Sequence, residues 1–208
     1  MAILTWPASL RNPQSARLAL AANTQSGGRS PFDNTEQTLE LPGARWVAEL
    51  RWGNLPESQW RIMQAFIASL GGRAGRFRWG PTATMPRRGT RGGTVTMSSG
   101  GQTGKYLQTT GWAVGGSTMA ALVGDLVGYV DPAGRDVFHM ITVDYMSDGT
   151  ANSVLSIAPA IRRSPAAGTA INYTNPKAIW RLASDDQGLE YERGVFAAAV
   201  LTIEEAIF

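Results

Sequence analysis

The chain has 208 residues, 43% of them hydrophobic, with 24 glycines, 11 prolines, no cysteine and a net charge of +3. This length suits one large domain or two small ones with a real core, and the hydrophobic content excludes wholesale disorder. The lack of cysteine excludes disulfides, thiolate nucleophiles and cysteine-ligated metals. No signal-peptide pattern opens the sequence, and no apolar run reaches the roughly 18 residues that span a bilayer. We therefore expect a soluble protein made in the cytosol.

The amino-terminal third is typical of β structure. Apolar residues predict strands over Ile3–Trp6 and Ala16–Ala22, whereas the polar, glycine-containing stretch Gln25–Asn34 predicts a loop. Two further stretches, Glu36–Leu41 and Arg45–Trp52, alternate in polarity as half-buried strands do. Because the turn dipeptide Pro42-Gly43 lies between them, we expect these two strands to form a hairpin.

One helix is predicted at about 56–70. Pro56 and Glu57 are helix-start signals, and Gly71-Gly72 is a stop signal. Between these signals an apolar stripe recurs at helical spacing, which predicts packing against a sheet. The stripe consists of Trp60, Met63, Phe66, Ile67 and Leu70. Trp46 and Trp52 are expected in the same core, and a short strand is predicted from Arg76 to Gly80.

The middle of the chain consists of short apolar runs and turn signals. Residues 82–118 are rich in loops, with short strands possible at 94–97, 106–109 and 112–114. Further runs follow, each ended by Asp, Asn, Gly, Ser or Pro: Leu122–Val130, Val137–Val143, Ser153–Ile157, Ala170–Tyr173 and Ala178–Leu182. Strands of this length and spacing are typical of a small antiparallel barrel or sandwich. The last run, Gly194–Ile203, predicts a long strand buried on both faces.

These elements predict a mainly β fold in which one domain interrupts another. Residues 1–80 and 176–208 are expected to form a discontinuous β-sandwich or barrel domain that carries the packed helix. Residues 81–175 are expected to form an inserted small β-barrel. Chain ends that rejoin one sheet are a common way to accommodate an insertion.

Charge is distributed unevenly along the chain. Residues 1–124 carry 13 basic and 5 acidic side chains, a balance of +8, and residues 125–208 carry 6 basic and 11 acidic, a balance of −5. No acidic residue lies between Glu57 and Asp125. The basic stretch fits three interpretations: a solvated loop, contact with nucleic-acid phosphates, or a face that meets an oppositely charged face of another subunit.

The sequence offers little catalytic chemistry. The single histidine, His139, lies among apolar residues of a predicted strand, and no Gly-x-Ser-x-Gly motif supplies a nucleophile for it. The aspartates at 131, 136, 144 and 148 do not match the spacing of a calcium-binding loop. We therefore expect no catalytic residue, no metal site and no cofactor.

Arginines and tryptophans around the predicted insertion are the candidates for an interface. Exposed tryptophan and arginine are the residues that most often anchor protein interfaces, and tryptophan also stacks on sugars. The candidates are Arg73, Arg76, Arg78, Trp79, Arg87, Arg88, Arg91, Trp112 and Trp180.

Several segments resemble distal tail proteins, or closely related minor tail and baseplate proteins, of long-tailed, siphovirus-type bacteriophages. The amino-terminal similarity lies in ARWVAELRW, PESQWRIMQAFIASLGG and GRFRWGP. The later similarity lies in Leu122–Asp125, the run into Asp148-Gly149, Ile157–Arg162 and Ala167–Thr169. In that family a β-rich belt domain forms a ring, usually hexameric, between the tail tube and the baseplate hub, and an inserted barrel projects outward.

The resemblance implies a non-enzymatic virion component. It implies a homo-oligomeric ring whose partners are the tail tube protein, the baseplate hub and the tape-measure protein. The genome would pass through the lumen without sequence-specific binding, and no membrane would be contacted. Two alternatives stay open: a carbohydrate-binding module that uses Trp79, Trp112 or Trp180 to stack on host sugars, and a hydrolase of cell-wall polymers.

Overall fold

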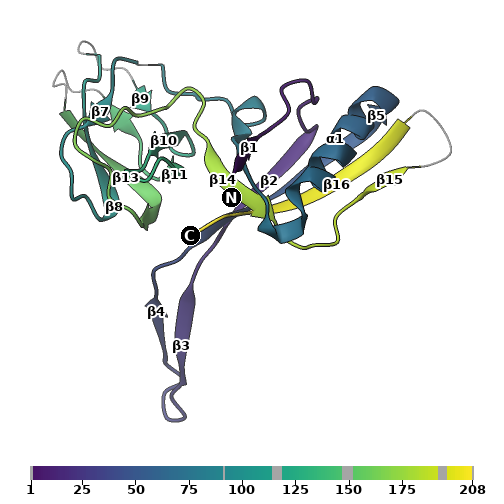
Figure 1. Cartoon of the computed structure of the whole chain (residues 1–208). Coiled ribbons are helices and arrows are strands. Elements are labelled where there is room, and N and C mark those ends of the chain that lie inside the picture. The colour runs from purple at the N-terminus through teal and green to yellow at the C-terminus, as the bar shows by residue number, and fades with distance from the viewer. Residues whose placement is uncertain (1, 91, 114–118, 147–151, 192–195, 208) are drawn as a thin grey trace.

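The computed structural model describes residues 2–90, 92–113, 119–146, 152–191 and 196–207 (Figure 1). The fold is mainly β with one α-helix, as predicted. Two short 3-10 helices, η1 (Gly72–Ala74) and η2 (Pro81–Ala83), flank the strand that follows the α-helix. No helix among these residues is long and apolar enough to cross a membrane.

The larger sheet combines strands from both ends of the chain. Its strand order is β1-β6-β14-β16-β5-β2, and β15 also pairs with β16. All of its pairings are antiparallel except the parallel pairing of β1 with β6. The strands are β1 (Ile3–Thr5), β2 (Ser15–Ala21), β5 (Arg45–Pro56), β6 (Arg76–Trp79), β14 (Ala178–Leu182), β15 (Leu189–Tyr191) and β16 (Phe196–Glu205).

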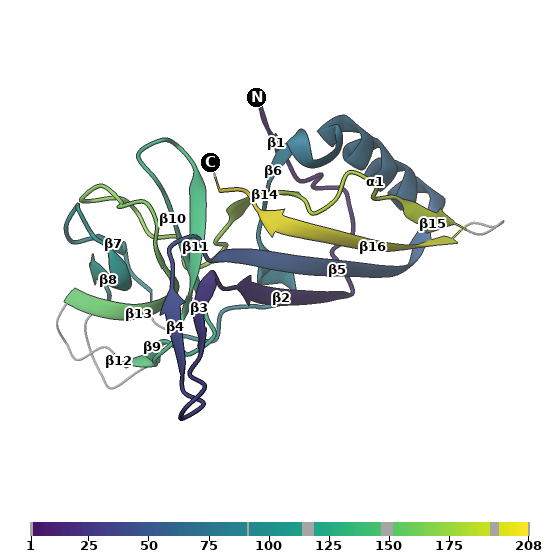
Figure 2. The ribbon, with the colours of Figure 1, turned by 90° about the horizontal axis from the view of Figure 1, so that it is seen from below.

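The helix α1 (Glu57–Leu70) follows β5 directly and covers one face of this sheet (Figure 2). Met63, Phe66 and Leu70 are buried on its inner side, as the apolar stripe predicts. The helix ends where Gly71 adopts a left-handed conformation with φ 62°, which glycine accepts without strain. The helix start and stop signals are thus confirmed.

On the opposite face of the larger sheet, the described part of β16 is not covered in this way. In β16, Leu201 and Ile203 are buried toward the helix side, whereas Val200 on the other face is 51% exposed. The prediction that this strand is buried on both faces is therefore wrong. Small and apolar residues, such as those of β16, occur on both covered and exposed faces of a sheet. The sequence of the strand alone therefore does not indicate on which side the helix packs.

A two-stranded hairpin projects from the molecule; its second strand is predicted, whereas its first strand lies where the sequence predicts a loop. It consists of β3 (Thr24–Arg29) and β4 (Glu36–Glu40), and it extends away from both sheets (Figures 1 and 2). The predicted hairpin between β4 and β5 is also wrong, because β5 pairs instead with β2 and β16. Burial explains the choice: Leu18 of β2 lies opposite Ala48 of β5, so their apolar faces share the core.

The middle of the chain forms a second, five-stranded sheet in the order β10-β11-β13-β8-β7. It curls into a half-barrel, and isolated bridges from Asn172 to Gly128 and from Ala170 to Thr96 span its edge strands. The predicted strand at 170–173 is present only as these bridges. The strands are β7 (Thr96–Met97), β8 (Gly104–Thr110), β10 (Leu126–Val130), β11 (Asp136–Ile141) and β13 (Asn152–Ile161), and β9 (Met119–Ala121) pairs separately with β12 (Tyr145–Met146). Trp112 and Ala113 form no strand, and residue 114 of that prediction lies outside the described residues.

The two sheets meet where the chain crosses between them. A Cβ atom added at Gly80 would lie 2.1 Å from the carbonyl oxygen of Pro176, so the outgoing and returning segments are in backbone contact. Phe138 of β11 belongs to the core of the larger sheet, where it stacks on Trp46 with ring centroids 5.5 Å apart. The half-barrel therefore contributes Leu126 and Phe138 to the core of the larger sheet, whereas its other buried apolar residues form a separate cluster. The domain division itself stays a prediction.

Candidate functional site

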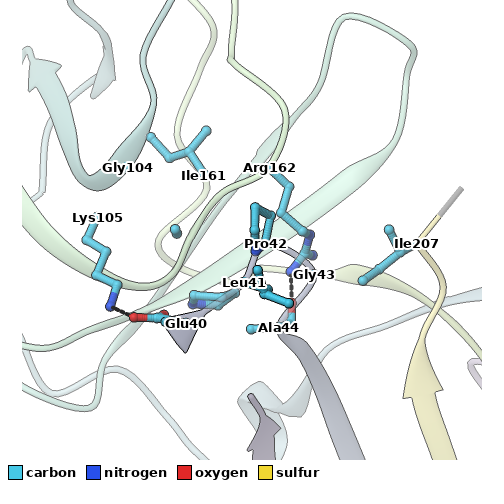
Figure 3. A pocket seen from close by; sticks show the side chains of 12 residues that line it. Glu40, Leu41, Pro42, Gly43, Ala44, Gly104, Lys105, Ile161, Arg162 and Ile207 are labelled. Atoms are coloured by element: carbon cyan, nitrogen blue, oxygen red, sulfur yellow. Dashed lines mark hydrogen bonds and ion pairs between the residues drawn. The ribbon is translucent and has the colours of Figure 1, made fainter. Parts of the chain in front are cut away.

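A groove of about 690 Å³ lies between the base of the β3–β4 hairpin and the half-barrel (Figure 3). The segment Glu40–Ala44 forms one wall, and Gly104, Lys105 and residues 159–162 form the other. Ile207, 47% exposed, closes one end. Most of the lining is apolar, so the groove can accept an apolar side chain.

Charged residues bridge the two walls of this groove. The ammonium of Lys105 lies 2.7 Å from a carboxylate oxygen of Glu40 (Figure 3). The guanidinium of Arg162 donates a hydrogen bond to the carbonyl oxygen of Ala44 at 2.5 Å. These contacts join the hairpin base to the half-barrel and thereby connect the two walls of the groove.

Behind the groove lies a buried ion pair. Arg162 pairs with the carboxylate of Glu205, which is 3% exposed and also accepts a hydrogen bond from the backbone N–H of Trp46 at 3.1 Å. Burial raises the pKa of Glu205, and the charge of Arg162 opposes that shift. The pair joins the last residue of β16 to the segment after β13, so it supports the groove from below.

His139 is buried beside this network and is not placed for catalysis. Its side chain is 0% exposed, and its Nδ1 lies 2.8 Å from the carbonyl oxygen of Pro159. Because a carbonyl can only accept, Nδ1 carries the proton. Its Nε2 has no hydrogen-bond partner among the described residues. Burial lowers the pKa of His139 to about 4.

We expect acid to destabilise the protein through His139. The unfolded side chain takes up a proton below its ordinary pKa of 6.5, whereas the folded one stays neutral down to about 4. The unfolded state therefore binds more protons in this window, and stability falls as pH drops, by up to about 1.4 kcal/mol per pH unit. Urea unfolding at several pH values measures the slope. His139→Asn should flatten it between pH 6.5 and 5; an unchanged slope would contradict the assignment.

The three tryptophans proposed for an interface are core residues instead. Trp79 is 6% exposed, Trp112 2% and Trp180 0%. Trp180 packs edge-on against Trp79 and donates its indole N–H to the Trp79 carbonyl oxygen at 2.9 Å. These residues flank the predicted insertion in sequence, but that junction is filled by side chains. The interface assignment is corrected for all three.

Trp46 and Trp52 lie in the core, as predicted, and Trp60 packs against it partly buried.

The first three candidate arginines are held by partners within the chain. Arg73 lies 3.4 Å from Glu204, and Arg78 lies 2.5 Å from Asp136. Arg76 donates to the carbonyl oxygens of residues 73, 74 and 75 at 2.7–3.0 Å. Desolvation by burial lowers the pKa of Arg76. Their placement favours structural roles.

The remaining candidates lie beside the half-barrel. Arg87 donates to the carbonyl oxygen of Ala120 at 2.6 Å, and its guanidinium sits over the ring of Tyr173, 4.4 Å from the centroid. Arg88 donates to the carbonyl oxygen of Val123, and its backbone N–H donates to buried Asp125 at 3.0 Å. Arg91 lies outside the described residues.

Part of the charge asymmetry is balanced within the chain. Arg78 pairs with Asp136 and Arg88 with Asp125, whereas Arg45 and Arg73 share the single carboxylate of Glu204 with Arg181. At Arg78 and Arg88 the basic stretch needs neither nucleic acid nor another subunit to balance its charge. Pairing within the fold is therefore a fourth explanation of the asymmetry.

Within the described residues, no group of three or more His, Asp or Glu side chains is placed to hold a metal ion. The absence of enzymatic activity and of a cofactor stays a prediction.

The chain matches no model of a known protein family, and no curated protein sequence matches it significantly.

Sequence reasoning missed the groove. Its lining comes from four separate segments, so no local pattern marks it. The hairpin tip, which lies apart from the groove, does carry a local signal: Phe32 stands in a mostly polar stretch, and in the structure it is 98% exposed.

Proposed function

We propose that the protein is a non-enzymatic structural component of a bacteriophage tail tip, a distal tail protein whose copies assemble into a ring. Such a ring, hexameric in the family that the sequence resembles, joins the tail tube to the baseplate hub and the tape-measure protein. Its lumen lets the genome pass without sequence-specific binding. The protein is then assembled in the host cytoplasm and resides in the virion.

The observation that carries this proposal is the projecting β3–β4 hairpin. Every residue of both strands is exposed, so the arm packs on nothing in its own chain beyond its base. An isolated two-stranded hairpin is at best marginally stable in water. An arm of this kind is expected to gain its packing from a neighbour, which supports a subunit that assembles with other chains.

A second observation supports assembly. Strand β2 is an edge of the larger sheet, with seven residues paired on one side only. Unpaired strand edges offer backbone donors and acceptors to another chain. The solvated face of this sheet also carries Val200 of β16, which is 51% exposed. A subunit surrounded by copies of itself would cover such features.

The carbohydrate-binding alternative loses the side chains on which it depended, because Trp79, Trp112 and Trp180 are buried. Sugar stacking needs an exposed aromatic face.

Localisation in phage particles tests the proposed function. Gold-labelled antibody against the protein should mark the tail tip of particles purified from cells that produce it. Labelling of tail fibres or heads instead, or a protein found only outside particles, would contradict the proposal. Antibody labelling of a structural head protein in the same preparation controls for access.

A further inference from the structure

The hairpin tip carries an almost fully exposed phenylalanine on a well-ordered turn. Phe32 is 98% exposed. The turn beneath it is closed by hydrogen bonds from the Ser30 N–H to the Thr35 carbonyl at 2.8 Å and from the Asn34 N–H to the Ser30 carbonyl at 3.0 Å. The Asp33 carboxylate accepts from the Thr35 hydroxyl at 2.9 Å. These bonds fix the backbone of the turn from which the Phe32 side chain projects, so less backbone freedom is lost on binding.

The groove at the hairpin base has the shape and chemistry to receive such a side chain. Its volume of about 690 Å³ exceeds what one phenylalanine needs and leaves room for neighbouring backbone. Leu41, Pro42, Ile161 and Ile207 give it apolar walls (Figure 3). A projecting knob, the Phe32 side chain, and a groove that can receive it are thus both present on one chain.

The knob cannot fill the groove of its own chain. The two lie at opposite ends of the extended β3–β4 hairpin (Figure 1). An occupant from a second copy meets no such restriction. Contact between two different surfaces of identical chains is heterologous, and it closes into a ring when the rotation between copies allows.

Charge also favours this occupant. Arg162 is already paired with buried Glu205, so it offers no free charge to an occupant. Lys105 pairs with Glu40 at the groove rim, but its side chain is 53% exposed, so its ammonium can meet a second carboxylate. Asp33 follows Phe32 directly in the tip, and the nearby Arg29 is paired with Glu36 at 3.6 Å. The tip therefore carries an acid beside its apolar side chain, and Lys105 is the cation at the rim that this acid can reach.

We propose that Phe32 of one copy inserts into the groove between the hairpin base and the half-barrel of the next copy, with Asp33 facing Lys105 at its rim. This inference rests on the proposed ring and names its subunit contact. Phe32 is then the anchor of the interface, and the groove is its pocket.

Two variants that block different halves of the contact test it. Phe32→Ala removes the knob and leaves the groove. Ala160→Trp fills the groove from β13 and leaves the knob. An interface anchor is expected to weaken association by at least about 30-fold when truncated to alanine. At concentrations where the natural chain forms rings, each variant should be monomeric by analytical ultracentrifugation.

Mixing the two variants makes the test specific. The intact knob of Ala160→Trp can enter the intact groove of Phe32→Ala, so an equimolar mixture should form one-to-one dimers that cannot extend. The chain with both substitutions should rescue neither variant. Val154→Ala, at a residue 58% exposed on the half-barrel, is the matched control and should assemble normally. Equal melting temperatures would show that the monomeric variants are folded.

The outcomes separate the two proposals. Rings that persist in Phe32→Ala would overturn this contact and leave the proposed function intact. Monomeric variants that do not dimerise when mixed would also overturn the pairing of knob with groove. A natural chain that is monomeric at all concentrations would overturn both the contact and the ring.

Discussion

Replacement of Glu205 by alanine should lower the free energy of unfolding by about 3–5 kcal/mol, because it removes one partner of a buried ion pair. Glu205 is 3% exposed, and the variant leaves the Trp46 backbone N–H without its acceptor and Arg162 without its counter-charge. Denaturant unfolding followed by tryptophan fluorescence measures the loss. A loss below about 1 kcal/mol, typical of exposed pairs, would show that the pair is solvated.

Two further variants test whether this loss comes from the burial of the ion pair. Glu36→Ala breaks the ion pair with Arg29 on the exposed hairpin, where the side chains are 38% and 68% exposed, and should cost about 0–1 kcal/mol. Arg162→Met combined with Glu205→Ala should cost less than the sum of the two single changes, because no uncompensated charge stays buried. Strict additivity would contradict a direct coupling between the two residues.

Replacement of Phe138 by alanine should cost about 3–5 kcal/mol, the usual range for a buried aromatic in a core. Phe138 is 0% exposed and belongs to the half-barrel strand β11, but it packs between Trp46 and Trp180 of the larger sheet. The cavity therefore opens at the junction between the two sheets. Unfolding in guanidinium chloride measures the cost.

The matched control is Phe138→Leu, which keeps most of the volume and should cost less than about 1.5 kcal/mol. Hydrogen exchange adds a positional test. In Phe138→Ala, exchange should rise in β11 and in β5 beside Trp46, whereas the far half of α1 should change least. A cavity effect confined to the half-barrel would contradict a shared core.

Local signals predicted the helical part of the fold well. The start of α1 near Pro56 and its end at Gly71 depend on backbone preferences of those residues alone, so the sequence contains them in full. The alternation of β5, with Trp46 and Trp52 inward, is equally local. The predicted pairing of β4 with β5 was wrong. The turn dipeptide Pro42-Gly43 favours that hairpin, but β5 pairs instead with β2, which precedes the hairpin in sequence and buries apolar residues against β5.

The candidate site was not predictable by the same route. Arg73 and Glu204 are separated by 131 residues and Arg78 and Asp136 by 58, so the arginine partners appear only in the fold. In sequence Trp180 stands at the end of the predicted insertion, where an exposed position is expected. In the structure its ring instead packs against Phe138 where the two sheets meet. The strand β4 was predicted, but its partner β3 was missed because a polar, glycine-containing strand without a buried face lacks the alternation that marks a strand.

The size of the natural assembly in solution is the measurement that tests the central claim most directly. Native mass spectrometry of the natural chain, with electron microscopy of the same sample, should show a closed ring of identical copies with an open lumen. The Phe32→Ala variant should shift that signal to the mass of one chain. A natural chain that stays monomeric at high concentration, or that forms only open and irregular aggregates, would contradict the ring.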